Sequence, residues 1–258
     1  MTISWNLRRK TYTAAQPINV IAMSEFWEKG TDAEVISMIT AARNGQYQLS
    51  DYWNIGDKRT ITIGEISGVG GASTIASREV DIVITEFGGK QLQDGTTCLF
   101  QWDFNVAVGN YPMRTTETNS GGYESSLIAP WLDDTFFAAL PSWLQSLSKS
   151  FYTNTSAGSG SRTINKKVHK LGIRTETEVF GTSKNSPAEG KVNTHISYYK
   201  TEENRLKVGG GYWLATVYNE SGDSYGNARN MCYVSSSSYW PSNCTADSRA
   251  NVAPYGCI

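Results

Sequence analysis

The sequence is poor in the residues on which metal and redox sites depend. It has only two histidines, His169 and His195. It has four cysteines with neither a Cys-x-x-Cys pair nor the spacing of zinc ligands: Cys98, Cys232, Cys244 and Cys257. We therefore expect no metal and no cofactor. We also expect all four cysteines to be reduced, because cytoplasmic synthesis favours free thiols.

Long hydrophobic runs and an excess of charge of one sign are also missing. No apolar run approaches the length of a membrane span, and the N-terminus lacks the apolar core of a secretory signal. The formal net charge is −1, and the densest basic cluster is Lys166, Lys167 and Lys170, which is typical of an exposed face. The sequence thus predicts a chain made in the cytoplasm, with no membrane contact and no nucleic-acid partner.

The most informative absence lies at the C-terminal end. Lys, Glu and Gln do not occur after Glu220, and Leu and Phe do not occur after Leu214. The residues that remain are mainly Tyr, Ser, Asn, Asp, Gly, Ala, Thr, Arg and Cys, around Trp213, Met231 and Trp240. Tyr gives rigid amphipathic contacts and Ser, Asn and Gly give adaptable hydrogen bonds, which is the chemistry of a binding surface. The alternative is a solvated, turn-rich end of the chain.

Local patterns predict a helix followed by short strands. Thr31 and Glu34 form a capping box before an apolar stripe, and Gly45 stands where a helix ends. Alternation around Ile61 and Ile63 predicts a half-buried strand, and further strands are expected over residues 78–87 and 98–104. The glycines at 68, 70 and 71 lack the lysine of a phosphate loop and predict a turn.

The middle of the chain is predicted to hold short helices over residues 119–151, divided by Pro130 and Pro141. Adjacent Asp133 and Asp134 point in different directions on a helix, which favours an exposed helix end over an acid–base pair. Residues 153–163 are expected to form a polar loop and residues 170–180 a strand. The resulting fold class is α+β, with an N-terminal arm and helix over 1–50 and one domain over 51–258.

Several motifs in a fixed order resemble a known group of domains. They are Trp53-Asn54-Ile55-Gly56-Asp57, Asp81-Ile82-Val83-Ile84, Asn119-Ser120-Gly121-Gly122-Tyr123-Glu124-Ser125, Glu178-x-Phe180-Gly181 and Tyr212-Trp213-Leu214. The order over residues 52–258 resembles an uncharacterised family of phage and bacterial domains that runs from Trp-x-x-Gly-Asp to Trp-Leu-Arg-Ser. The chain departs from it at Ala215, where the family has Arg, and at Ala253 in the terminal Val-Arg-Pro.

Members of this family look like the variable proteins of diversity-generating retroelements, which carry a C-type-lectin-like fold. Mutagenesis of template adenines in such systems turns Asn codons into Tyr, Ser, Asp and similar residues, and never into Lys, Glu or Gln. The resemblance implies a ligand-binding domain with a variable region over about 212–258. It implies substituted positions on one solvent face, which we expect to be Tyr218, Asn219, Asp223, Tyr225, Asn227, Tyr233, Ser235, Ser237, Tyr239, Ser242, Asn243, Asp247 and Asn251. The fixed residues expected beneath them are Trp213, Leu214, Met231, Val234, Trp240 and Val252.

The resemblance also implies a role as a phage tail adhesin or a displayed bacterial surface protein. The expected partner is a protein or glycan of a bacterial host surface, with other tail proteins and a homo-oligomer as further partners. The chain would be made in the bacterial cytoplasm and act in the virion or at the cell surface. Two alternatives stay open: an ordinary carbohydrate-binding lectin module, and a cysteine-dependent enzyme of the formylglycine-generating type. For an enzyme, a nucleophile pair of Cys98 or Cys257 with His169 or His195 is conceivable, but we expect no enzyme.

Overall fold

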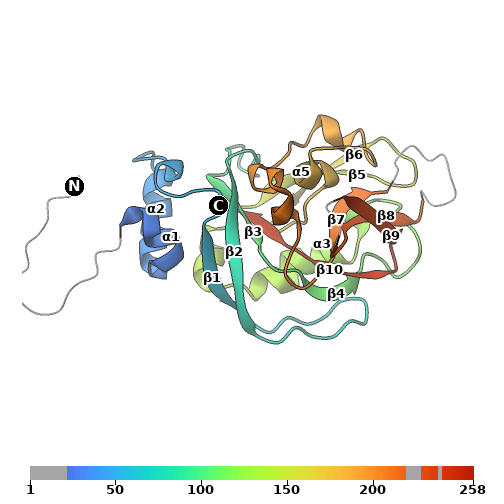
Figure 1. The fold of residues 1–258 in the computed structure, drawn as a ribbon, viewed down its shortest axis with the longest axis horizontal. Coiled ribbons are helices and arrows are strands. Elements are labelled where there is room, and N and C mark those ends of the chain that lie inside the picture. The colour runs from blue at the N-terminus through green and yellow to red at the C-terminus, as the bar shows by residue number, and fades with distance from the viewer. Residues whose placement is uncertain (1–21, 219–227, 238–239) are drawn as a thin grey trace, which may run out of the picture.

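A computed structural model describes residues 22–218, 228–237 and 240–258 as a mixed α+β fold with three open sheets (Figure 1). The first sheet has the order β1 (Lys58–Ile63), β2 (Arg78–Phe87), β3 (Phe100–Phe104) and β11 (Tyr255–Cys257), with every pair antiparallel. The second has the order β4 (Val108–Pro112), β10 (Arg249–Val252), β7 (Tyr212–Val217), β8 (Asn230–Val234) and β9 (Pro241–Thr245). The third is a hairpin of β5 (Phe151–Ser156) and β6 (Ile164–His169).

The helices are short and lie around these sheets. They are α1 (Phe26–Lys29), α2 (Asp32–Arg43), α3 (Ile128–Trp131) continuing into a π-helical turn (Leu132–Phe136), α4 (Ser142–Leu147) and α5 (Glu176–Phe180). Helices α1 and α2 lie at one end of the molecule beside β1, and the β8–β9 hairpin lies at the other end (Figure 1). None of the helices in the described part of the chain is long and apolar enough to span a membrane.

Helix α2 begins and ends where its sequence predicts. The Thr31 hydroxyl accepts the Glu34 N–H, and the Glu34 carboxylate accepts the Thr31 N–H at 2.7 Å, which completes the capping box. The helix ends at Arg43, and Gly45 follows with φ of 72°, a left-handed conformation that glycine adopts without strain. Trp27 of α1 is fully buried against Trp53 and Phe100, so these helices share the core of the first sheet.

The predicted strands around residue 60 and over 78–87 are confirmed, and the strand over 98–104 is confirmed with a later start. In β1 the side chains alternate between exposed and buried, with Arg59, Ile61 and Ile63 inside. Strand β2 has the predicted bounds. The turn at Gly70 and Gly71 is also confirmed, since both residues have positive φ and lie in a turn.

Two local predictions in the middle of the chain are wrong. The expected loop over 153–163 begins as strand β5, whose residues pair with β6 from Phe151↔His169 to Ser156↔Ile164. The expected strand over 170–180 contains helix α5. Its capping box joins Thr175 and Glu178, and Gly181 follows it with φ of 68°. A five-residue helix is too short to show apolar periodicity, so its caps were the signal in the sequence.

The second sheet is held by a buried tryptophan. Trp213 in β7 is fully buried, and its indole N–H donates to the Tyr111 carbonyl of β4 at 2.7 Å. It also packs against Tyr233 of β8, with ring centroids 6.3 Å apart. The side chain therefore spans the sheet from β4 to β8.

We predict that Trp213→Ala lowers the free energy of unfolding by about 3–5 kcal/mol, because it leaves a large cavity and an unpaired carbonyl. Urea denaturation measures this change. Trp240→Ala is the matched control, since Trp240 is 59% exposed, and it should change stability by about 0.5 kcal/mol at most. Equal effects of the two variants would contradict the assignment of Trp213 as a core residue.

Candidate functional site

The C-terminal segment expected to bind a ligand is built into the second sheet. Strands β7, β8 and β9 are neighbours in that sheet, and β9 is its edge strand within the described chain. The β8–β9 register runs from Asn230↔Thr245 to Val234↔Pro241. All five residues of β9 are half-buried. Among the described residues of this segment, the exposed side chains lie in the turns beside β8 and β9 and at Arg249 of β10.

The predicted scaffold residues are confirmed as buried with one exception. Trp213, Leu214, Met231, Val234 and Val252 are each at most 1% exposed. The prediction for Trp240 is wrong, because its side chain is 59% exposed just before β9. The Lys184 ammonium lies 5.6 Å from the centre of its ring. At this position the chain enters β9, which is the edge of its sheet in the described part of the chain.

The residues predicted to be variable are accessible to different degrees. Ser237 and Asp247 are exposed. The following are half-buried rather than exposed: Tyr218, Tyr233, Ser235, Ser242, Asn243 and Asn251. Five predicted positions lie outside the described residues: Asn219, Asp223, Tyr225, Asn227 and Tyr239. No ligand tests these positions, so their binding role stays a prediction.

The described members were expected to share one face of the sheet, but Tyr233 packs against the main core and Tyr218 against a different buried cluster. In β8, Met231 and Tyr233 face the main core, whereas Cys232 and Val234 belong to a second buried cluster on the other side. Both faces of β8 are therefore covered. The amide of Asn251 donates to the Gly209 and Gly211 carbonyls at 2.9 and 3.0 Å, so it holds a loop in place.

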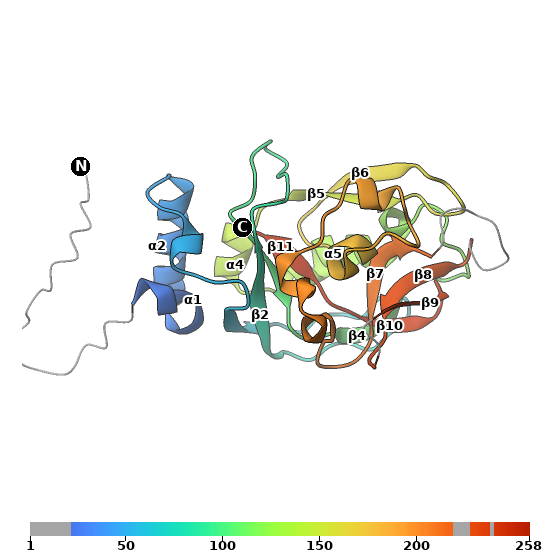
Figure 2. The same cartoon turned by 45° about the horizontal axis from the view of Figure 1, so that its top comes forward.

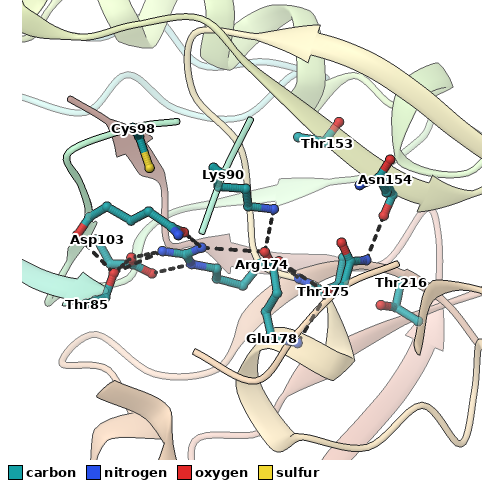
Figure 3. Close-up of polar contacts among 12 residues, drawn as sticks. Thr85, Lys90, Cys98, Asp103, Thr153, Asn154, Arg174, Thr175, Glu178 and Thr216 are labelled. Carbon is teal, nitrogen blue, oxygen red and sulfur yellow. Dashed lines mark hydrogen bonds and ion pairs between the residues drawn. The ribbon is translucent and has the colours of Figure 1, made fainter. Parts of the chain in front are cut away.

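A buried polar network of side chains from the first sheet centres on Arg174 (Figure 3). Both Asp103 oxygens accept hydrogen bonds from its guanidinium, at 2.5 and 3.0 Å. The guanidinium also donates to Gln101 Oε1 at 2.6 Å and to the Thr85 hydroxyl at 3.0 Å. The ring of Tyr255 lies 3.7 Å from its central carbon. All five side chains are at most 1% exposed.

Pairing with cations favours the ionised form of both buried carboxylates in this network. Burial would raise the pKa of Asp103, but the charge and hydrogen bonds of Arg174 hold that pKa below its ordinary value. Glu178 behaves in the same way: burial opposes its charge, and Lys90 and Arg174 lower its pKa. Lys90 Nζ lies 2.6 Å from Glu178 Oε1. The network thus joins two cations to two carboxylates.

Lys207 also lies close to this network, but burial disfavours its charged form. Its ammonium has no hydrogen-bond partner among the described residues and sits 5.0 and 5.5 Å from the rings of Tyr199 and Tyr198. Burial lowers the pKa of Lys207 to about 8, although Asp103 opposes the shift. The Tyr199 hydroxyl donates to Asp103 at 2.6 Å, which links this lysine's surroundings to the network.

A separate polar cluster, the His169 cluster, joins His169 to two carboxylates. Its Nδ1 lies 2.7 Å from Asp133 Oδ2 and its Nε2 lies 2.8 Å from Glu124 Oε2. The other Asp133 oxygen accepts the backbone N–H groups of Lys170 and Leu171. The prediction of an exposed helix end is therefore wrong for Asp133, although Asp134 is exposed. Sequence reasoning missed this cluster because its members are 36 and 45 residues apart.

The cysteines are free thiols, as expected. Both nitrogens of His169 are taken by carboxylates, and the His195 ring nitrogen contacts the Val179 carbonyl at 3.2 Å. Cys98 donates to the Gly88 carbonyl at 3.0 Å. The conceivable Cys–His pair is thus not seen in these contacts. The described residues also contain no group of three or more His, Cys, Asp or Glu side chains arranged to hold a metal ion.

Comparison with known families gives one match. The model of a domain of unknown function, DUF6273, matches residues 94–258, more than half of the chain. The chain belongs to the DUF6273 family. No curated protein and no solved structure matches it. The DUF6273 segment includes Asp103, Arg174 and Glu178 and the whole His169 cluster, whereas Thr85 and Lys90 precede it.

The His169 cluster predicts a pH dependence of stability in this DUF6273 protein. Burial would lower the pKa of His169, but the hydrogen bonds to Asp133 and Glu124 outweigh it and raise the pKa to about 9. A histidine with a raised pKa stabilises the fold fully below its unfolded pKa of about 6.5 and loses this effect as pH rises through about 9. We predict that the free energy of unfolding falls by up to about 3 kcal/mol over this window from this residue.

The measurement is urea denaturation at pH 6, 7, 8, 9 and 10 for the protein and for His169→Gln. The comparison with the variant is needed because Glu189, whose pKa burial raises to about 8, and Lys207 titrate in the same range. The difference between the two proteins should shrink as pH rises. A difference that stays constant from pH 6 to 10 would contradict the charged state of His169.

Proposed function

We propose that this chain is a ligand-binding protein whose C-terminal segment forms a changeable surface, and that it acts as a phage tail adhesin on a bacterial host surface. We also propose a C-type-lectin-like arrangement for residues 51–258, in keeping with open sheets, short helices and long ordered connections. The proposed partner is a protein or glycan of the host surface. Several copies of a weak site on one tail would increase binding through multivalency.

The observation that carries the proposal is the distribution of buried and accessible side chains within the terminal segment. Its large apolar side chains, such as Trp213 and Met231, are buried, whereas its edge strand β9 carries the short polar residues Ser242 and Asn243 half-exposed. Changing a packed core residue costs about 1–5 kcal/mol, comparable with the stability of a whole domain. Changing an accessible residue usually costs about 0.5 kcal/mol or less. The segment therefore supports many surfaces on one scaffold.

The amino-acid composition of the terminal segment is an independent argument for the same proposal. The absence of Lys, Glu and Gln after Glu220 extends across both β8 and β9 and the connections beside them. A solvated surface would normally use these three residues freely, since they are favourable in contact with water. Replacement of template adenines in Asn codons would leave Lys, Glu and Gln out of the substituted positions.

We predict that the gene carries the trace of that process. A near-copy of its 3′ end, differing at adenines, should lie beside a reverse-transcriptase gene. Sequencing independent isolates should then show substitutions within codons 212–258 and none at Trp213, Leu214, Met231, Val234 or Val252. Substitutions spread evenly over the gene, or found at these buried positions, would contradict a variable surface.

We predict that changes at the β9 edge abolish binding to host cells without unfolding the protein. The double variant Ser242→Arg, Asn243→Arg adds bulk and charge at half-exposed positions. Labelled protein bound to whole cells of the host gives the readout, and the melting temperature reports folding. Thr62→Arg is the matched control, because Thr62 is exposed in β1 at the opposite end of the molecule (Figure 1). Loss of binding in this control, or full binding by the double variant, would refute the assignment.

A second candidate function is carbohydrate binding of the ordinary lectin kind. The exposure of Trp240 favours it, because an accessible aromatic ring beside polar side chains can pack against a sugar. Binding on a glycan array separates the candidates. If the protein is a lectin of fixed specificity, Trp240→Ala should lose the glycan that the unchanged protein binds. If it is an adhesin with a changeable surface, independent variants that all retain Trp240 should differ in the ligand they bind.

A further inference from the structure

A polar pocket lies away from the terminal segment, between the β2–β3 connection, the β5–β6 hairpin and residues 192–196. Its volume is about 220 Å³. Its floor is formed by Lys90, Glu178 and Gln101, which belong to the Arg174 network (Figure 3). Figure 2 shows that α5, which carries Glu178, lies between β11 and β7, while β5 and β6 run above it. The pocket thus connects the surface to the buried charges.

One wall of the pocket consists of side chains that share one face of the β5–β6 hairpin. Side chains alternate along a strand, so Tyr152 and Asn154 of β5 point to the same side. Lys166 is the register partner of Asn154 on β6 and shares that side. The Lys166 ammonium lies 4.3 Å from the centre of the Tyr152 ring and 2.9 Å from Gln91 Oε1. The hairpin therefore presents an aromatic ring, an amide and a cation to the pocket.

The groups left for a ligand are mainly donors of hydrogen bonds. Glu178 is already satisfied: Oε1 faces Lys90 and Arg174, and Oε2 accepts the Thr175 N–H at 2.8 Å. Lys90 has three N–H donors, and among the described residues Glu178 is its one hydrogen-bond acceptor. The ammonium groups of Lys90 and Lys166 thus have spare donors at the same pocket. A ligand that completes them carries negative charge.

The charges around the pocket also favour a negatively charged ligand. Lys90 and Arg174 balance Glu178 and Asp103, so the Arg174 network beneath the pocket is neutral as a unit. Lys166 adds one uncompensated positive charge at the mouth, where it bonds a neutral amide. Asn154 and Asn193 also line the pocket, and a side-chain amide can both donate to and accept from hydroxyl groups. One N–H of the Asn193 amide already donates to the Asn154 carbonyl at 2.9 Å. This combination suits a carboxylate with neighbouring hydroxyls.

We propose that this pocket binds a single acidic sugar ring, with its carboxylate between Lys90 and Lys166 and its hydroxyls on the amides of Asn154 and Asn193. The volume is below the ~300–1,000 Å³ of sites for drug-sized ligands, which limits the occupant to about one ring. This proposal does not depend on the C-terminal surface, since it uses other residues. The sugar is either a free acid or the terminal residue of a glycan.

Isothermal titration of the full chain with galacturonate, galactose and inorganic phosphate tests the proposal. Galacturonate should bind at least tenfold more tightly than galactose, which lacks the carboxylate, and than phosphate, which lacks the ring. The methyl glycoside of galacturonate separates the two sources: if it binds as well as the free acid, the pocket takes a glycan terminus, and if it does not, the free acid is the ligand. Equal binding of galacturonate with galactose or phosphate, or no binding of galacturonate, overturns the proposal.

Two variants place the binding in this pocket. Asn154→Asp keeps the size of the side chain and adds a negative charge, and it should weaken galacturonate binding at least tenfold. Lys166→Glu reverses an exposed charge and should do the same, so the test survives if the first variant does not fold. Lys167→Gln is the control, because Lys167 is the next residue of β6 and points to the other face. Unchanged binding in both pocket variants, or equal loss in the control, overturns the site.

Discussion

The burial of the Arg174 guanidinium is the constraint on which much of this structure depends. A guanidinium has five N–H donors and cannot lose its charge, so its removal from water is tolerated only where acceptors surround it. The acceptors come from β2 and β3, and the Tyr255 ring from β11 covers the group. Three strands of the first sheet are therefore fixed relative to one another by one side chain.

The same residue also ties the first sheet to the second. Its carbonyl accepts the N–H of Ala215 in β7 at 2.8 Å. Directly after it, Thr175 caps α5, whose first N–H group, that of Glu176, bonds to the Thr216 hydroxyl at 2.8 Å. The pocket floor and the strand that begins the terminal segment are thus positioned from a single stretch of chain. A shift of this stretch would move both proposed sites.

What could be read from the sequence follows from the range of each interaction. The bounds of α2 and β2 were predictable, because a capping box and apolar alternation are local signals. The partners of Arg174 and His169 were not, since Asp103 lies 71 residues from Arg174 and Glu124 lies 45 residues from His169. No spacing rule joins such residues before the fold is known. Trp240 was misplaced for a related reason: burial of an aromatic depends on whether another strand covers it.

Strand β9 is the edge of the second sheet in the described chain, and this position leaves its side chains partly accessible. Backbone bonds to β8 hold this strand, and all five of its side chains are half-buried. An edge strand also presents unpaired N–H and C=O groups, which favours aggregation unless the strand is short or interrupted. Strand β9 has five residues and begins with Pro241, which lacks an N–H group. These features limit pairing with further strands while leaving the side chains accessible, so side-chain identity rather than backbone pairing would decide what this edge binds.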